Sequence, residues 1–369
     1  MERNHFIDKL DDIQFLLDLT QQFIGQIDPK EKKAEKSTEK YVEKSIQRDA
    51  LEEIYHSLGG SRWKNSTNWL SDLPISQWFG VKTRLERGQN IVYSLQLQNN
   101  NLIGEIPPAL GQLINLESLY LEHNTIVGQI PKEISLCQNL QTISLGNNQL
   151  KPSIVPEIGL LKNLKTLSLN NNQFQNEIPL ELGLLVNLEA LMLQNNLLIG
   201  NIPVSFSELS KITYLDLSNN QLSGEIQENA LITKQLYYLD ISNNMFNGFV
   251  PGNWRYLANL KKLYIQNNKF SGKLFKLIDK LNDSSIYKDY NVNLYGEITR
   301  DFKNKLLLEK TLTGFENLTE IEVSHFFDGC WKNLEIFHLY NNSFTLTDVD
   351  ELLINKQFTK CKIIFKLEE

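Results

Sequence analysis

The chain has 369 residues, of which 41% are hydrophobic and 22% charged, and its formal net charge is −7. The hydrophobic content is too high for a wholly disordered chain, and the negative charge argues against a protein that binds the nucleic acid backbone. No run approaches the ~20 apolar residues that a membrane-spanning helix needs. The length allows two or three compact domains or one long repeat array.

The first 45 residues predict a helical extension followed by a charged linker. Side chains within residues 1–28, most of them apolar, alternate steps of four and three, which places them along one helical stripe: Phe6, Leu10, Ile13, Leu17, Thr20, Ile24 and Ile27. We favour packing of this helix against the rest of the chain, because about four heptads are short for a stable coiled coil. Self-association through residues 1–28 is the alternative. Residues 29–45 are rich in Lys and Glu and predict a solvated linker or an exposed helix.

Residues 46–90 predict a cap made of a helix and a tryptophan-rich segment. Five residues share one face of the expected helix, and Gly59 and Gly60 end it. The five are Ala50, Leu51, Ile54, Tyr55 and Leu58. Trp63, Trp69 and Trp78 follow, and their burial would stabilise the cap.

Asparagines recur every 24 residues through residues 91–284. They are Asn100, Asn124, Asn148, Asn172, Asn196, Asn220, Asn244 and Asn268. Each stands in the frame L-x-L-x-x-N-x-L, and most are followed by Gly and then by Ile-Pro or Val-Pro. Alternating leucines predict a short strand with one buried face. The asparagine amide then bonds the backbone of neighbouring turns, which satisfies a buried polar group.

A second apolar row follows each predicted turn. Its members are Leu113, Cys137, Leu161, Leu185, Leu209 and Leu257. One coil cannot bury both rows, but eight stacked coils form a continuous core. The motif L-x-G-x-I-P and the period resemble the plant-type class of the leucine-rich repeat family. The resemblance implies an α/β repeat fold, a curved right-handed solenoid with a parallel sheet on its concave side.

The tryptophan-rich segment resembles the N-terminal cap of that class, in which two cysteines enclose the pattern around Trp78. Here Ser76 and Thr83 occupy the cysteine positions. The chain's three cysteines are odd in number and far apart, and acidic residues interrupt the N-terminus where a signal peptide is apolar. These features predict a cytoplasmic protein, with secretion as the alternative.

The C-terminal part predicts a less regular end to the array. Residues 285–344 look like degenerate repeats, with strand halves at 317–323 and 333–344. Residues 345–369 predict a C-terminal cap. In it a helix opens at Thr347, with Asp350 three positions on, and the segment 360–366 adds an edge strand.

We find no catalytic motif, no phosphate loop and no metal-ligand spacing, and the five histidines are scattered. The sequence therefore predicts a protein that is not an enzyme and that uses no cofactor and no metal.

The outward residues of the predicted strands are the candidate binding residues. They change from small polar side chains to tyrosines and aspartates along the array, and tyrosine suits the centre of an interface. The candidates are Tyr120, Met192, Tyr214, Asp216, Tyr238, Asp240, Lys262 and Tyr264. Aspartates beside tyrosines favour a basic partner.

The family resemblance and these residues predict a scaffold that recognises a protein or peptide on the concave face, in signalling or assembly, and does not bind nucleic acid. One alternative is an extracellular protein that binds carbohydrate or inhibits a cell-wall enzyme. A second is a structural protein that self-assembles through the N-terminal helix.

Overall fold

The computed structural model describes residues 35–231, 233–251, 253–254 and 257–271, together with strands at 321–326, 336–338 and 357–364. The chain divides into two compact units, Met1–Ile46 and Gln47–Glu369. The predicted amphipathic helix within residues 1–28 and the helix predicted to open at Thr347 lie outside the described residues.

One helix, α2 (Glu35–Ser57), contains both part of the predicted charged linker and the predicted cap helix. The segment from residue 35 onward is therefore helical, and the helix runs through the predicted boundary at residues 45/46. Ala50, Leu51, Ile54 and Leu58 are buried on one face, as the spacing predicts. Gly59 follows the helix with a φ of 67°, a left-handed conformation that glycine adopts without strain.

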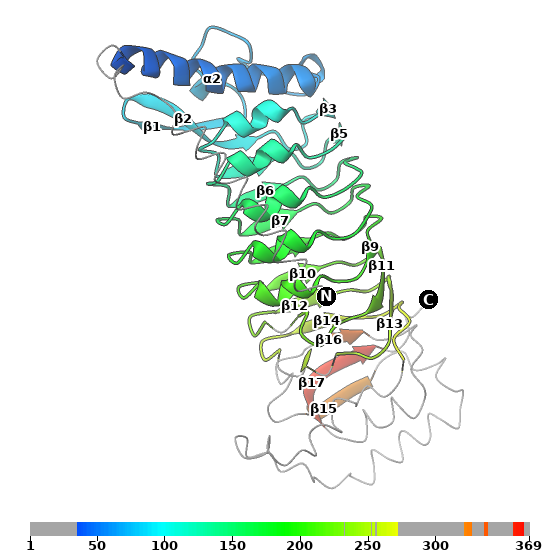
Figure 1. The fold of residues 1–369 in the computed structure, drawn as a ribbon. Helices are drawn as coiled ribbons and strands as arrows, with labels where there is room; N and C mark the ends of the chain where they lie inside the picture. Colours follow the sequence, from blue (N-terminus) through cyan, green and yellow to red (C-terminus); the bar gives the residue numbers. More distant parts are fainter. Residues whose placement is uncertain are drawn as a thin grey trace, which may run out of the picture. The chain divides into compact units, whose positions relative to one another are not determined.

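The main sheet has twelve strands in the order β1-β2-β4-β6-β7-β8-β10-β12-β14-β16-β17-β15. The strands are β1 (Val81–Glu86), β2 (Gln89–Gln96), β4 (Ser118–Tyr120), β6 (Thr142–Ser144), β7 (Thr166–Ser168), β8 (Ala190–Met192), β10 (Tyr214–Asp216), β12 (Tyr238–Asp240), β14 (Lys262–Tyr264), β15 (Ile321–Phe326), β16 (Ile336–His338) and β17 (Gln357–Ile364). From β2 to β14 the strands are parallel, and each pairs with the residue 24 positions on, as Leu95 does with Leu119. This confirms the predicted repeat fold with a parallel sheet (Figure 1).

The eight asparagines of the 24-residue frame, Asn100 to Asn268, form the series of backbone contacts that the frame predicts, and we call them the asparagine ladder. The Asn148 amide nitrogen donates to the carbonyls of Leu121 at 3.0 Å and Leu145 at 3.1 Å, while its oxygen accepts from the Ile126 N–H at 3.0 Å. At the first coil, Asn100 makes the same two kinds of bond to the backbone of Asn65 in the cap. Each ladder asparagine thus bonds the backbone of the coil before it.

The other side of each coil carries a short 3-10 helix or a small sheet. The 3-10 helices of the repeats are η4 (Pro108–Gln112), η5 (Lys132–Leu136), η6 (Pro156–Leu160), η7 (Leu180–Leu184) and η8 (Val204–Glu208). The small sheets pair β3 (Ile103–Glu105) with β5 (Thr125–Val127), and β11 (Gln221–Glu225) with both β9 (Ile199–Gly200) and β13 (Met245–Asn247).

The second apolar row is buried, and most of its members directly follow one of the 3-10 helices. Cys137 belongs to this row, and burial raises the pKa of its thiol to about 12. A thiol held in the neutral form in the core has a structural role, as its place in the leucine row predicts.

The cap contains a hairpin that we did not predict from the sequence. Strands β1 and β2 pair antiparallel, and Arg87 and Gly88 turn between them with φ of 45° and 80°. Two short 3-10 helices, η2 (Gly60–Arg62) and η3 (Ile75–Gln77), precede the hairpin. The three predicted tryptophans are buried, and the Trp63 and Trp69 ring centroids lie 4.9 Å apart.

The last strands depart from the predicted order. The segment expected to form an edge strand belongs to β17, which lies between β16 and β15, so the prediction of an edge position is wrong. Strand β15 pairs antiparallel with β17 and forms the edge instead. A strand that pairs antiparallel does not continue the parallel coil register, so the segment at 321–326 is not a regular repeat strand.

Candidate functional site

The sheet register brings the predicted tyrosines and aspartates together. We call Tyr214, Asp216, Tyr238, Asp240 and Tyr264 the tyrosine–aspartate cluster. Tyr214 pairs with Tyr238, and Asp216 pairs with Asp240 across β10 and β12. The Tyr214 and Tyr238 rings are stacked, with centroids 4.3 Å apart and planes within 10°, and the Tyr238 and Tyr264 centroids lie 5.5 Å apart. The 24-residue period thus produces one continuous aromatic surface over three strands.

The two carboxylates of the cluster are fixed by local hydrogen bonds. The Oδ1 atom of Asp216 accepts from the N–H of Ser218 at 3.1 Å and from its hydroxyl at 2.7 Å. Asp240 accepts in the same way from Ser242, at 2.9 and 2.6 Å. The Tyr238 hydroxyl donates to Asp240 Oδ2 at 3.3 Å. The aspartates therefore stabilise the exit of each strand, and the second oxygen of Asp240 lies beside the tyrosine.

The cluster carries two carboxylates, those of Asp216 and Asp240. Within the described ranges, no cationic side chain forms an ion pair with Asp216 or Asp240. Burial raises the pKa of the Asp216 carboxyl. Burial also raises the pKa of Asp240 to about 6, and the charge of Asp216 adds to that increase. A bound cationic group would relieve both the desolvation of these carboxylates and their mutual repulsion.

The tyrosine hydroxyls of the cluster are hydrogen-bond donors at neutral pH. Burial raises the pKa of Tyr214, Tyr238 and Tyr264, and the charges of the neighbouring aspartates add to the increase. A ligand that meets this surface therefore contacts aromatic rings, protonated hydroxyls and carboxylates.

We expect Asp240→Asn to stabilise the folded protein at pH 7.5 by about 3 kcal/mol and to give no gain at pH 4. The pKa of Asp240 is about 6 in the folded state, against about 3.9 in an unfolded chain. The unfolded state therefore binds fewer protons between these values, and stability falls as pH rises through that window. Asparagine keeps the oxygen that accepts from Ser242. Urea unfolding at both pH values measures the effect.

The matched control for this prediction is Asp72→Asn, because Asp72 is exposed in the cap. It should change stability at neither pH. A loss of stability in Asp240→Asn at pH 7.5 would contradict the argument from burial.

The remaining predicted site residues divide into two groups. Met192 pairs with Asp216, and Lys262 pairs with Tyr238, so both border the cluster. Tyr120 lies four strands away from β10 in the sheet order, beside Gln96 and Ser144. The structure therefore brings seven of the eight predicted residues together and leaves Tyr120 apart.

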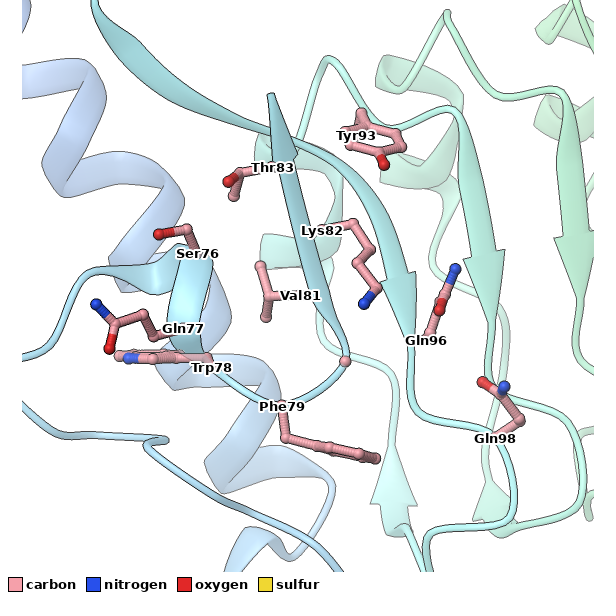
Figure 2. Close-up of a pocket in the computed structure, with 11 residues that line it drawn as sticks. Ser76, Gln77, Trp78, Phe79, Val81, Lys82, Thr83, Tyr93, Gln96 and Gln98 are labelled. Carbon is pink, nitrogen blue, oxygen red and sulfur yellow. The ribbon is translucent and has the colours of Figure 1, made fainter. Parts of the chain in front are cut away.

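A cavity of about 680 Å³ lies at the other end of this sheet surface, between η3 and the β1–β2 hairpin. Figure 2 shows Lys82 on β1 with Gln96 of β2 beside it and Gln98 farther away. Tyr93 and Phe79 lie at opposite ends of the cavity. We did not predict this cavity, because the hairpin that forms it lies outside the repeat frame. The short alternating strand at 89–96 and the Arg-Gly turn before it were signals in the sequence.

The described part of the chain shows no group of three His, Cys, Asp or Glu side chains arranged to hold a metal ion. In the same part, no helix is both long and apolar enough to cross a bilayer.

The family models decide what the repeats are. One model, Leucine rich repeat, matches residues 92–150, and a second of the same description matches residues 163–185, 211–230, 235–257 and 259–281. The chain is a leucine-rich repeat protein. No curated protein sequence matches it.

The solved structures that are similar to this leucine-rich repeat protein include plant proteins. The PEPR1–AtPEP1 complex shares 26% identity at a TM-score of 0.56, over 62% of this chain and 32% of that one. A plant ice-binding protein shares 26% identity at a TM-score of 0.53, over 64% of this chain and 83% of that one. The Arabidopsis receptor kinase HAESA, in complex with the peptide hormone IDA and the co-receptor SERK1, shares 21% identity at a TM-score of 0.51, over 82% of this chain and 46% of that one. The leucine-rich repeat protein spans about a third of the first of these chains.

These neighbours confirm the plant type that the L-x-G-x-I-P motif predicts. They give no support to the prediction that the leucine-rich repeat protein is intracellular.

Proposed function

We propose that this leucine-rich repeat protein is a non-enzymatic scaffold that recognises a peptide on the sheet face formed by β2 to β14. The tyrosine–aspartate cluster carries the proposal, because it combines stacked rings and protonated hydroxyls with two carboxylates on adjacent strands. Neither carboxylate forms an ion pair within the part of the chain that the structure describes. Tyrosine is enriched at the energetic centres of protein interfaces, and a negative surface favours a partner with basic groups. The ligand is therefore a peptide with a Lys, an Arg or a free amino group.

The likeness to HAESA supports a peptide, because the same fold holds a peptide hormone there. It also supports the extracellular alternative over the cytoplasmic prediction, since that neighbour is a receptor for a hormone. Ser76 and Thr83 stand where that class of cap has its two cysteines, and the buried tryptophans then supply the stability that a disulfide would give the cap.

The test is a selection from a phage library of random peptides about 15 residues long, enough to cross the face in extended form. Wild type should enrich a family of peptides that contain basic residues. We expect Tyr214→Ala/Tyr238→Ala/Tyr264→Ala to weaken binding of the selected peptides by at least about tenfold, since each ring is a candidate anchor. Calorimetry on synthetic copies measures the change.

Tyr237→Ala is the matched control, because Tyr237 is 42% exposed but lies just before β12, outside the cluster. It should leave the affinity unchanged.

The competing function is that of the ice-binding neighbour. Two results together would replace peptide recognition with ice binding. Wild type would enrich no peptide, and wild type and the triple variant would both slow the growth of ice crystals.

A further inference from the structure

The cavity at one end of the sheet face and the tyrosine–aspartate cluster at the other differ in the sign of the charged side chains that line them. At the β1–β2 end, Lys82 is the only charged side chain that lines the cavity. No carboxylate in the described segments forms an ion pair with it. The amides of Gln96 and Gln98 lie beside the same space, as Figure 2 shows, and each carries N–H donors. An ammonium group with neighbouring amide donors suits a carboxylate.

The cavity also holds apolar surface beside this polar group. Phe79 is 37% exposed and forms one end of the cavity, and Gly80 and Val81 lie between it and Lys82. A small acidic side chain with its methylene groups can contact Phe79 while its carboxylate meets Lys82. Aspartate and glutamate match this combination.

The middle of the face, at β6 and β7 between Tyr120 on β4 and Met192 on β8, carries short side chains with hydroxyl groups. The outward residues of β6 and β7 are Thr142, Ser144, Thr166 and Ser168. Their short side chains leave room for a backbone to lie across the strands, and the hydroxyls of Thr142, Ser144 and Thr166 can bond its amides and carbonyls. Ser168 is buried, and its hydroxyl donates to Asn170 Oδ1 at 2.7 Å. The strand before them, β4, adds Ser118, whose hydroxyl bonds that of Ser94 at 2.8 Å.

The sheet order sets the distance between the two ends. Strand β10, which carries Asp216, is the sixth strand after β1, which carries Lys82. Neighbouring strands lie about 4.8 Å apart, so the two positions are separated by about 29 Å. An extended peptide advances about 3.3 Å per residue and covers this span with about nine residues.

We propose that the cavity at β1–β2 binds a carboxylate of the same peptide whose cationic group lies at the tyrosine–aspartate cluster. The inference rests on the proposed function and adds a direction and a length to it. The peptide lies across the strands, with an Asp or Glu side chain at Lys82 and a basic group about nine residues away at Asp216 and Asp240.

The test applies the same peptide library to wild type, to two charge variants and to a control variant, and compares the residues that each protein enriches in the selected peptides. Wild type should enrich peptides in which an acidic and a basic residue stand about nine positions apart. Lys82→Met should lose the acidic preference and keep the basic one. Asp216→Asn/Asp240→Asn should lose the basic preference and keep the acidic one. Each loss should reduce the affinity of a synthetic wild-type peptide by about tenfold, the size of a charge-assisted contact.

Lys132→Met is the matched control, because Lys132 is an exposed lysine in η5 on the other side of the coil. It should keep both preferences. If wild type enriches basic peptides with no acidic position, or if Lys82→Met keeps the acidic preference, the inference fails and the proposed function stands. If wild type enriches no peptide, the proposed function fails as well.

Discussion

Replacing Asn172 by alanine should lower the free energy of unfolding by about 4 kcal/mol. The Asn172 amide nitrogen donates to the carbonyls of Leu145 at 3.0 Å and Leu169 at 3.1 Å, and its oxygen accepts from the Leu150 N–H at 3.0 Å. Asn172 is buried, so water cannot replace the lost side chain. Each buried backbone group left without a partner costs about 1–3 kcal/mol.

Urea unfolding followed by circular dichroism measures this loss. Gln173→Ala is the control in the same coil, because Gln173 is exposed and its backbone N–H keeps its bond to Leu150. It should change the free energy of unfolding by less than about 0.5 kcal/mol. Equal stabilities for the two variants would mean that the ladder adds nothing beyond the leucine core.

Gly80→Ala should destabilise the cap by about 3 kcal/mol or more, the combined cost of a left-handed non-glycine residue and a disturbed backbone hydrogen bond. Gly80 has a φ of 79°, and a Cβ there would lie 2.3 Å from the Gln96 carbonyl oxygen and 2.8 Å from a methyl group of Leu97. The Gln96 N–H also donates to the Gly80 carbonyl at 2.7 Å. The chain before β1 and the end of β2 must therefore separate at the open end of the hairpin, and the cavity loses its shape.

Gly88→Ala separates the two parts of this effect. Gly88 has a nearly equal φ of 80° but lies exposed at the hairpin turn. Alanine there therefore carries the cost of the left-handed backbone conformation without a close contact to a neighbouring strand. That cost is about 1–2 kcal/mol. Tryptophan fluorescence during urea unfolding reports on the cap in both variants. A Gly80→Ala loss no larger than that of Gly88→Ala would show that the close contact with Gln96 is not limiting.

The repeat fold followed from the sequence because its determinants are local and periodic. Leucines two residues apart and an asparagine in a fixed place specify the same coil eight times. The residue before most ladder asparagines is also asparagine, and the structure gives the reason. Asn147, for example, has a φ of 57°, a conformation that Asn tolerates better than most other residues.

The candidate site was predictable in position but not in chemistry. The period identified Tyr214, Tyr238 and the aspartates as outward neighbours. It could not show that Ser218 and Ser242 fix the carboxylates, or that Asp240 has a raised pKa, because both depend on burial by adjacent coils. The cavity at Lys82 depends on a hairpin that occurs once, so no repetition marked it.

The asparagine ladder gives the array a direction. Each ladder side chain bonds backbone only in its own coil and the coil before it, and Asn100 extends the series to the cap through Asn65. A chain shortened from its C-terminal side by whole coils loses the asparagine that satisfies its new last coil. Removal of whole coils from the N-terminal side keeps these bonds for the backbone of every remaining coil, but the first remaining asparagine loses its partners in the preceding coil. Duplication of an internal coil preserves all of these bonds, so the array can gain length internally more readily than it can lose its C-terminal end.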